Sequence, residues 1–229
     1  VDIHGKPMIQ HVYERSCLAN CTDSVVVATD DLRIANTVKG FGGKVIMTSP
    51  DHPSGTDRMV EVSYSIKADI YINVQGDEPL IRPEDIDLLA RTMKDDRSCQ
   101  VGTLCHPIPI AEALDANTVK LILSHSGNVL YFSRLPIPYV TNSEYQSEYL
   151  KHIGIYGYRS DVLVKYKDLP KSNLENLERL EQLRLLESDY SIKAVRTSRT
   201  GPGVDTPACL EKVKRIMARE YPRQVRLAN

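Results

Sequence analysis

Residues 69–79 have the sequence Asp69-Ile-Tyr-Ile-Asn-Val-Gln-Gly-Asp-Glu-Pro79. The first six of these residues form a short apolar and β-branched run, which is typical of a buried strand. Gly76 then lets the backbone turn, and Pro79 ends strand pairing because it has no N–H to donate. Helical spacing follows over residues 82–93. We therefore expect a strand, a tight loop with two carboxylates, and a helix.

The same alternation of strand and helix patterns extends along the first half of the chain. Strand patterns lie at residues 24–29, 44–47 and 69–74. One helical pattern ends near residue 39, and two others span residues 55–66 and 82–93. Such alternation is typical of βαβ units around a parallel sheet. Right-handed crossovers then favour the doubly wound arrangement.

The middle of the chain has a different pattern, with two strand patterns flanking Gly127-Asn128 as in a hairpin and a third at 151–159. Helical patterns return at 160–165 and 173–188, before a strand pattern at 191–196 and a helical one at 206–220. We predict an α/β fold with a doubly wound, mostly parallel, Rossmann-like sheet. It is expected to be a single domain over residues 1–229, with a β-rich insertion at 120–159.

Composition and charge argue against several classes of protein. The 229 residues include 29 Lys and Arg against 30 Asp and Glu, a net charge of -1, so no basic excess indicates a nucleic-acid partner. No apolar run is long enough to span a bilayer, and no secretory signal is found. Five cysteines, an odd number, do not make a closed disulfide framework. We expect a globular protein of a reducing, intracellular compartment, without nucleic-acid or membrane partners.

Two carboxylates lie in loops where a ligand is expected. In open α/β sheets, ligands bind beyond the carboxyl ends of the strands, and Asp77 follows such a strand. Asp205 lies in Gly201-Pro-Gly-Val-Asp-Thr-Pro207, directly before the last helix. Mg²⁺ often takes one or two carboxylates together with substrate phosphates. The pair suggests a metal site, while the structural alternatives are a simple turn at Asp77 and a helix N-cap at Asp205.

The segment Asp51-His-Pro-Ser-Gly-Thr-Asp-Arg58 combines small hydroxyl residues with a glycine at a helix start. Such a start exposes backbone N–H groups to an anion or a sugar, and Arg58 adds a fixed positive charge. The segment is not a Walker loop, and His52 alone is more typical of a surface loop than of a catalyst.

The segment His152-Ile-Gly-Ile-Tyr-Gly-Tyr158 alternates as a strand does, so that His152, Tyr156 and Tyr158 share one face. That face is either a ligand surface or a packed aromatic layer.

Polar residues also accompany the leucine stripe of the expected 173–188 helix. Glu181 and Gln182 lie beside that stripe, either as ligands for a polyhydroxylated substrate or as part of a solvated face. We interpret Cys17 and Cys21, four residues apart on an expected helix, as free thiols rather than zinc ligands.

Taken together and in order, these segments resemble those of the 3-deoxy-manno-octulosonate cytidylyltransferase family (CMP-Kdo synthetase). The likeness covers essentially the whole chain, and nine segments in the same order argue strongly against coincidence. The matching segments are Asp2-Ile-His-Gly-Lys-Pro-Met-Ile9, Val26-Val-Ala-Thr-Asp30, residues 51–58 and 73–79, Asn117-Thr-Val-Lys120, Tyr131-Phe-Ser-Arg-Leu-Pro-Ile-Pro138, residues 152–158, Leu180-Glu-Gln-Leu-Arg184 and Gly203-Val-Asp-Thr-Pro207.

The resemblance implies a nucleotidyltransferase fold and a reaction of CTP with 3-deoxy-manno-octulosonate (Kdo) that gives CMP-Kdo and pyrophosphate with Mg²⁺. It further implies a cytoplasmic homodimer with its contact in the 120–159 segment, and a role in making lipopolysaccharide or capsule. Carried over by position, the catalytic residues and metal ligands are Asp77 and Asp205, the nucleotide side is His52, Ser54, Gly55, Thr56, Arg58 and Gln75, and the sugar-acid side is Arg134, His152, Tyr156, Glu181 and Gln182.

The chain departs from the family pattern in one respect. Members of the family have a strand and a basic loop, Pro-Ala-Arg-x-x-Ser-x-Arg-x-x-x-Lys-Pro-Leu, before the position of Val1, and that loop cradles the CTP phosphates. We expect the sequence to be truncated there. The same reaction on 8-amino-Kdo or a sialic acid stays open as an alternative, as does a non-catalytic relative if the natural chain starts at Val1.

Overall fold

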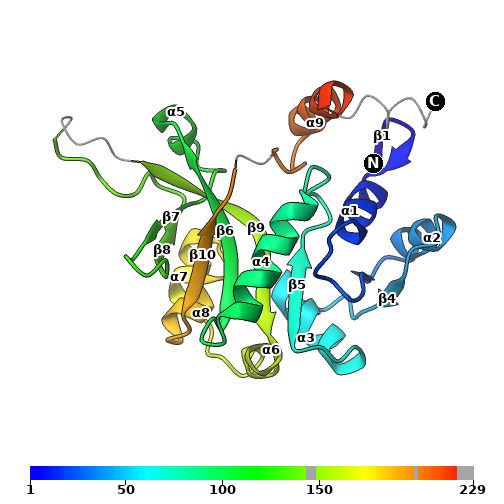
Figure 1. Ribbon diagram of the computed structural model, residues 1–229, viewed down its shortest axis with the longest axis horizontal. Helices are drawn as coiled ribbons and strands as arrows, with labels where there is room; N and C mark the ends of the chain where they lie inside the picture. Colours follow the sequence, from blue (N-terminus) through cyan, green and yellow to red (C-terminus); the bar gives the residue numbers. More distant parts are fainter. Residues whose placement is uncertain (143–147, 199–200, 221–229) are drawn as a thin grey trace. The chain divides into compact units, whose positions relative to one another are not determined.

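A computed structural model describes residues 1–142, 148–198 and 201–220 (Figure 1). The contacts of the backbone divide the chain into two compact units, each of which is described by itself. Unit 1 comprises Val1–Ile66, Asn73–Leu88 and Thr200–Asn229, and unit 2 comprises Lys67–Ile72 and Leu89–Arg199. The single domain expected from the sequence stays a prediction. Residues 143–147 of the expected insertion lie outside the described residues.

Unit 1 contains short strands and most of the helices of the first half of the chain. Its complete elements are β1 (Asp2–Ile3), β2 (Lys6–Pro7), α1 (Met8–Cys17), β3 (Val27–Thr29), α2 (Leu32–Gly40), β4 (Val45–Met47), α3 (Gly55–Ser65) and α9 (Pro207–Glu220). It also holds the end of β5 (Ile70–Val74) and the first half of α4 (Pro83–Asp95). β3 pairs with β4 in parallel, with Val27 opposite Val45 and Thr29 opposite Met47.

A small apolar cluster fixes the loops of unit 1 that follow β5 and precede α9. Ile3, Leu80, Val213 and Met217 are buried together, and Val204 packs against them. Leu80 comes three residues after Asp77, and Val204 comes one residue before Asp205. Burial of these apolar side chains therefore sets where both carboxylate loops run.

Unit 2 is built on a sheet with the strand order β10-β6-β9-β7-β8, and β5 also pairs with β9. Its elements beyond β5 and α4 are β6 (Val101–Ile108), α5 (Ile110–Ala113), β7 (Lys120–Leu123), β8 (Val129–Ser133), β9 (Tyr149–Arg159), α6 (Ser160–Tyr166), α7 (Asn173–Glu178), α8 (Leu183–Glu187) and β10 (Ile192–Arg196). β10 and β6 are parallel, whereas β9 is antiparallel to both β6 and β7, and β7 is antiparallel to β8.

Two glycines let the second half of α4 approach this sheet closely. A Cβ on Gly102 of β6 would lie 2.7 Å from Leu89 Cδ1, and one on Gly157 of β9 would overlap Met93 Sδ. Leu89 and Met93 are fully buried. Gly157 therefore serves helix packing, which is the close backbone approach that glycine permits.

The predicted α/β class is confirmed, and the predicted hairpin is formed by β7 and β8. Outside the insertion, the pairs of β3 with β4 and of β10 with β6 are parallel as expected. The insertion adds the antiparallel pairs of the larger sheet, and its strand β9 lies between β6 and β7 rather than at an edge. The short strands β1 and β2 form a further antiparallel pair. In the described ranges, no helix is long and apolar enough to cross a membrane.

Two predictions of helices were wrong. The expected helix over 173–188 is two helices, α7 and α8, because Arg179 adopts a left-handed conformation (φ 53°) at the end of α7. The helix α1 ends at Cys17, so Cys21 lies beyond it. All five cysteines are free thiols, among them Cys17 and Cys21, for which the sequence predicted this state.

Candidate functional site

The loop after β5 turns sharply and is joined to the loop before α9. The N–H of Glu78 donates to the carbonyl of Gln75 at 3.2 Å, and the N–H of Val204 donates to the carbonyl of Asp77 at 2.9 Å. A Cβ on Gly203 would lie 3.2 Å from Glu78 Oε1 and 3.5 Å from the Asp77 carbonyl. The two loops are thus in direct contact, and Gly203 leaves the space for it.

Asp77 and Asp205 form an acidic pair in these joined loops. Burial raises the pKa of Asp77 above its ordinary value, and the nearby charge of Asp205 raises it further. A divalent cation would relieve this repulsion, and carboxylate oxygens are the ligands that Mg²⁺ prefers. Among the described residues, no group of three or more His, Cys, Asp or Glu side chains could hold a metal ion. The donor pair fits an Mg²⁺ that takes its other ligands from water and phosphate.

The N-cap of α9 is Thr206, not Asp205. The hydroxyl Oγ1 of Thr206 accepts the N–H of Cys209 at 3.2 Å, which is the third helical position. Asp205 is exposed one residue earlier. The capping alternative for Asp205 is therefore wrong.

The start of α3 packs against the end of β5. A Cβ on Gly55 would lie 3.3 Å from Gln75 Nε2 and 3.5 Å from Asn73 Nδ2. Ser54 is the N-cap, since its hydroxyl accepts the Asp57 N–H at 3.2 Å and donates to the Asp57 carboxylate at 2.5 Å. The neighbouring Thr56 is buried. Of the predicted nucleotide residues, this region brings Gly55 and Gln75 together.

Asn73 is a residue of this region that sequence reasoning missed. Its side-chain nitrogen Nδ2 is buried and has no hydrogen-bond partner among the residues that the structure describes. Asn73 and Gln75 are two residues apart at a strand end, so they project to the same face. The two-residue spacing from Gln75 could therefore have identified Asn73 as a site residue from the sequence.

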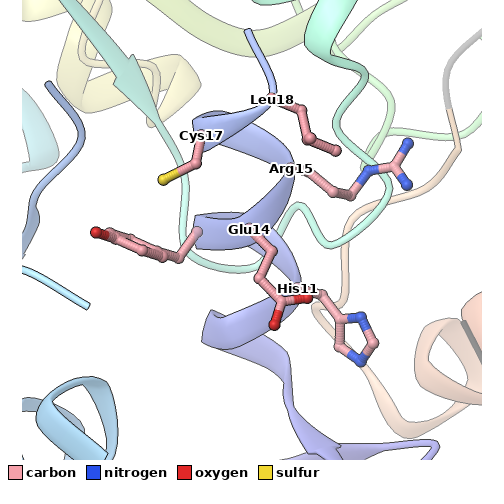
Figure 2. Close-up of a pocket in the computed structure, with 6 residues that line it drawn as sticks. His11, Glu14, Arg15, Cys17 and Leu18 are labelled. Atoms are coloured by element: carbon pink, nitrogen blue, oxygen red, sulfur yellow. The ribbon is translucent and has the colours of Figure 1, made fainter. Parts of the chain in front are cut away.

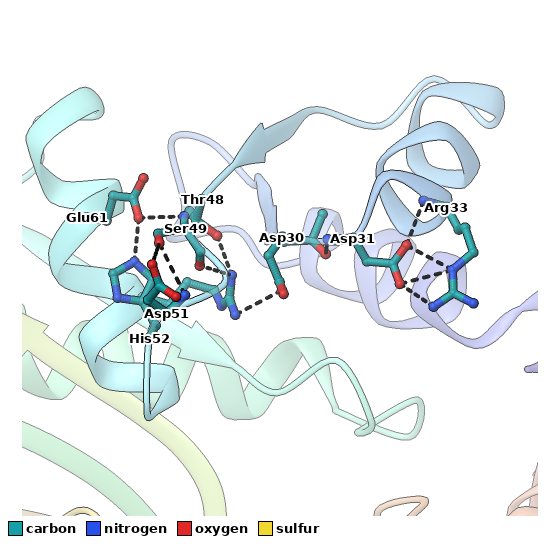
Figure 3. A network of polar contacts seen from close by, with 10 residues as sticks. Asp30, Asp31, Arg33, Thr48, Ser49, Asp51, His52 and Glu61 are labelled. Carbon is teal, nitrogen blue, oxygen red and sulfur yellow. Dashed lines mark hydrogen bonds and ion pairs between the residues drawn. The ribbon is translucent and has the colours of Figure 1, made fainter.

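His52 belongs to a polar network that joins the loop after β4 to α3 (Figure 3). The guanidinium of Arg58 pairs with Asp30 at 3.0 Å and also donates to the Thr48 hydroxyl. His52 Nε2 contacts Glu61 Oε2, which also accepts the Ser49 N–H at 2.9 Å. The contact with His52 lowers the pKa of Glu61.

These contacts join the ends of β3 and β4 to α3 within unit 1. Both Arg58 and His52 are half-buried and hold other protein groups in this structure. Their predicted contact with the nucleotide stays a prediction.

In unit 2, the aromatic side chains of β9 line one face, as alternation predicts. The ring of His152 lies 5.1 Å from that of Tyr156 and 5.2 Å from that of Phe132, and Tyr156 stacks on Tyr158 at 5.9 Å. Two extra residues, 154 and 155, fall between the β9 partners of Thr103 and Leu104. Side chains alternate between the two faces of a strand, so two extra residues leave the alternation unchanged. His152 and Tyr156 therefore stay on the same face of β9.

The polar groups of this face are strongly perturbed. Burial, assisted by the charge of Lys151, lowers the pKa of His152 to about 3, so the ring is neutral near pH 7. Its Nε2 lies 3.1 Å from Thr103 Oγ1. The Tyr156 hydroxyl is buried without a hydrogen-bond partner in the described part of the chain. Burial raises its pKa, and the charge of Glu181 is one of the lesser causes.

Glu181 and Gln182 lie on the short turn between α7 and α8. Gln182 is buried and Glu181 is half-buried. The charge of Glu181 acts on the Tyr156 hydroxyl as one of the lesser causes of its raised pKa. The structure brings His152 and Tyr156 into ring contact and places Glu181 on the neighbouring turn.

Arg134 reaches this turn through main-chain carbonyls. Its Nε donates to the carbonyl of Glu178 at 2.7 Å, and its Nη1 donates to that of Ala116 at 3.1 Å. Four of the predicted sugar-side residues thus lie on β9 or on the α7–α8 turn: His152, Tyr156, Glu181 and Gln182. Arg134, directly after β8, bonds to the last residues before that turn.

A pocket elsewhere in unit 1 takes no part in either cluster. It is lined by His11, Tyr13, Glu14, Arg15, Cys17 and Leu18, which belong to α1 and its C-cap (Figure 2). Arg15 is held by the carbonyl of Ile81 at 2.5 Å, and Glu14 by Lys6 at 2.8 Å. None of the predicted site residues lines this pocket.

Comparison with known proteins gives consistent results. A family model described as cytidylyltransferase matches residues 1–193. The 3-deoxy-manno-octulosonate cytidylyltransferase of Escherichia coli is 56% identical over 96% of this chain and 89% of its own length. The protein of the same description from Syntrophobacter fumaroxidans is 45% identical over 96% of this chain and 90% of its own length.

Solved structures agree with these relatives. A CMP:2-keto-3-deoxy-manno-octonic acid synthetase complexed with CTP has a TM-score of 0.93 and 55% identity, and covers 96% of this chain and 91% of its own. HddC from Yersinia pseudotuberculosis, at 15% identity and a TM-score of 0.66, shares the fold alone, over 95% of this chain and 88% of its own. The predicted fold class is confirmed by the first of these likenesses.

Proposed function

Since this chain belongs to the 3-deoxy-manno-octulosonate cytidylyltransferase family, we propose that it transfers CMP from CTP to the anomeric hydroxyl of Kdo and releases pyrophosphate. The observation that carries the proposal is the likeness over nearly the whole chain to relatives of that description, one of which was solved with CTP. The two clusters of polar residues described above support it, because each offers groups suited to one of the two substrates.

The acidic pair of unit 1 is suited to a reaction at phosphate. CTP and Kdo are both anions, so their approach needs positive charge. Mg²⁺ held by Asp77 and Asp205 would supply that charge and would lower the pKa of the attacking hydroxyl. The hydrogen bond from the Val204 N–H to the Asp77 carbonyl joins the two loops that carry these carboxylates, and so would hold both near one metal ion.

The start of α3 and the end of β5 are suited to the nucleotide. Gly55 leaves room beside the amides of Asn73 and Gln75, and the buried Nδ2 of Asn73 has a free donor in the described part of the chain. Amide side chains can donate to and accept from a base or ribose. His52, Ser54, Thr56 and Arg58 would border this region and hold its shape.

The aromatic face of β9 is suited to the sugar acid. A neutral His152 can donate or accept a hydrogen bond, and the Tyr156 hydroxyl and the Glu181 carboxylate add a donor and an acceptor. Such groups match the hydroxyls of a polyhydroxylated acid. Because both clusters act by binding and orientation, we propose direct in-line attack on the α-phosphate without a covalent enzyme intermediate.

The experiment that tests this function is pyrophosphate release with CTP, Mg²⁺ and Kdo, with each component omitted in turn. We expect release only when all three are present. A parallel comparison of Kdo with 8-amino-Kdo and N-acetylneuraminate decides the sugar acid. Release with N-acetylneuraminate but not with Kdo would overturn the proposed substrate while keeping the reaction class.

We also propose that the protein is a cytoplasmic homodimer whose product enters lipopolysaccharide synthesis. Large apolar side chains in the expected contact segment support the dimer, since Leu130, Leu135 and Tyr139 are 59%, 70% and 86% exposed. The five free thiols suit a reducing compartment. Sedimentation of the protein and of its Tyr139→Asp variant tests the dimer, because a charge at that face would favour the monomer.

A further inference from the structure

Lys120 is a fully buried lysine on β7, with none of its surface exposed. Its ammonium Nζ donates to the carbonyls of Asp115 at 3.0 Å, Thr118 at 2.5 Å and Arg134 at 2.5 Å. An ammonium has three N–H groups, so main-chain carbonyls satisfy all of them. Buried lysines are rare, because burial of an ammonium costs free energy unless acceptors compensate its charge. The three carbonyls provide that compensation for Lys120.

Arg134, whose carbonyl accepts from Lys120, also donates its own side-chain N–H groups to main-chain carbonyls. Its Nη2 donates to the carbonyl of Arg179 at 3.4 Å, in addition to the bonds from Nε to Glu178 and from Nη1 to Ala116. The Glu178 carboxylate in turn accepts the Ser133 hydroxyl at 2.8 Å and the Arg134 N–H at 2.9 Å. The end of β8 is thereby fastened to the last residues of α7.

Arg179, whose carbonyl accepts one of these hydrogen bonds, has a strained backbone. Arg179 has φ 53° and ψ 50°, a left-handed conformation that a residue other than glycine adopts only at a cost. Leu180, Glu181 and Gln182 follow directly, and the N–H of Leu183 closes this turn on the carbonyl of Leu180 at 3.1 Å. Without an external hold, the cost at Arg179 would favour another path for the turn.

The other side of the turn is held as well. Arg184 of α8 makes a bidentate pair with Glu175 of α7, at 2.7 and 2.6 Å, and its guanidinium lies over the Tyr166 ring. The turn that carries Glu181 is thus fixed by one arginine on each side. The main-chain carbonyl of Arg134 accepts the buried ammonium of Lys120, so its backbone position depends on that cation.

We propose that Lys120 is a positioning residue for the sugar-acid site. It acts through Arg134, which bonds to the carbonyls of Glu178 and Arg179, and so holds the turn that carries Glu181. The role rests on the function proposed above, in which Glu181 contacts the sugar acid. It assigns to Lys120 no contact with either substrate.

The test compares Lys120→Met with Lys193→Met, measuring KM for Kdo and for CTP separately. Methionine fills the volume but donates to none of the three carbonyls. Lys193 is a matched control, because it lies on β10 of the same sheet and its ammonium pairs with Asp96 at 2.7 Å. We expect Lys120→Met to raise KM for Kdo about tenfold or more, with KM for CTP within about twofold. Lys193→Met should change neither.

A second variant tests the route through Arg179. Glycine favours the left-handed conformation, so Arg179→Gly in the Lys120→Met background should recover much of the KM for Kdo. An unchanged KM for Kdo in Lys120→Met, an equal rise in both KM values, or no recovery with Arg179→Gly would each overturn the proposal. If Lys120→Met does not fold, Glu178→Ala tests the same link, because it removes the carboxylate that accepts the Ser133 hydroxyl and the Arg134 N–H, and the same selective rise is expected.

Failure of the proposed function would be recognised separately. The wild-type protein would then release no pyrophosphate with Kdo but would do so with another sugar acid. The KM comparison, repeated with that acid, still tests Lys120.

Discussion

The main-chain N–H of Val204 donates to the main-chain carbonyl of Asp77 at 2.9 Å. This one bond joins the loop that leaves β5 to the loop that enters α9, and each loop carries one carboxylate of the acidic pair. Because the bond is between main-chain groups, side-chain substitutions at Asp77 or Asp205 leave it in place. Substitutions at Asp77 or Asp205 can therefore test the role of the carboxylates in the reaction without breaking the contact between the two loops.

Asp77→Asn should abolish Mg²⁺-dependent turnover while the fold is kept. The loss in kcat should be at least about a hundredfold, since a metal at a reacting phosphate contributes several kcal/mol. The raised pKa of Asp77 means that its charge opposes folding near pH 7, so the variant should melt at the same temperature or higher. Kinetics at several Mg²⁺ concentrations and thermal unfolding check both parts. Asp23→Asn, which changes an exposed carboxylate, is the control, and near-normal turnover of Asp77→Asn would exclude Asp77 as a ligand.

Gly201→Ala should destabilise the protein through the same pair of loops. A Cβ at this position would overlap Leu80 Cδ1 and lie 2.9 Å from Leu80 Cβ, and Leu80 belongs to the buried cluster. Overpacking of this kind costs about 1–3 kcal/mol. Gly40→Ala is the matched control, because a Cβ there meets nothing within 4 Å and should change stability by less than about 1 kcal/mol. Urea unfolding of both variants measures the difference, and equal stabilities would contradict the close packing of Gly201 against Leu80.

Much of the fold could be predicted because local patterns determine it. Apolar runs and turn residues locate the strands, and β7 and β8 form the hairpin expected around Gly127. The central place of β9 could not be predicted, since strand order depends on pairing between distant segments. The break at Arg179 was also hidden, because the leucine stripe runs on through it and no glycine marks the left-handed residue.

The candidate site was predicted unevenly for similar reasons. Asp77 and Asp205 follow motifs whose spacing to strand and helix is visible in the sequence. Whether Asp205 or Thr206 caps α9 depends on hydrogen-bond geometry alone, and the structure selects Thr206. The carbonyls that hold Lys120 and Arg134 come from segments far apart in the chain, so no local pattern indicates them.

His152 should make the stability of the protein depend on pH. Burial keeps its pKa at about 3 in the folded state, below its ordinary value of 6.5. The unfolded chain therefore binds a proton at this histidine between these values while the folded protein does not, so stability falls as pH falls from about 6.5 towards 3. The slope from this residue approaches about 1.4 kcal/mol per pH unit.

Urea unfolding at pH 7, 6 and 5 measures that slope. His152→Gln removes the titrating group, so the stability of this variant should vary less with pH than that of the wild type. Subtracting the two curves isolates His152 from the other five histidines. Parallel curves for the two proteins would mean that His152 titrates normally in the folded state.

Tyr156→Phe should separate binding from stability. The Tyr156 hydroxyl is buried and has no hydrogen-bond partner within the described ranges, so its removal should cost no stability and relieves a desolvated group. If the hydroxyl serves the sugar acid, the variant should raise KM for Kdo about five- to tenfold, the loss of one hydrogen bond of about 1 kcal/mol or slightly more. KM for CTP should not change.

Tyr71→Phe provides the opposite control in the same unit. The Tyr71 hydroxyl accepts the Ala68 N–H at 3.1 Å, and Tyr71 is buried as Tyr156 is. Losing this bond should lower the free energy of unfolding by about 1 kcal/mol and leave both KM values unchanged. Two Tyr→Phe changes in one sheet region thus have opposite expected signatures. A loss of stability in Tyr156→Phe without a change in KM for Kdo would show that its hydroxyl is structural and does not bind the sugar acid.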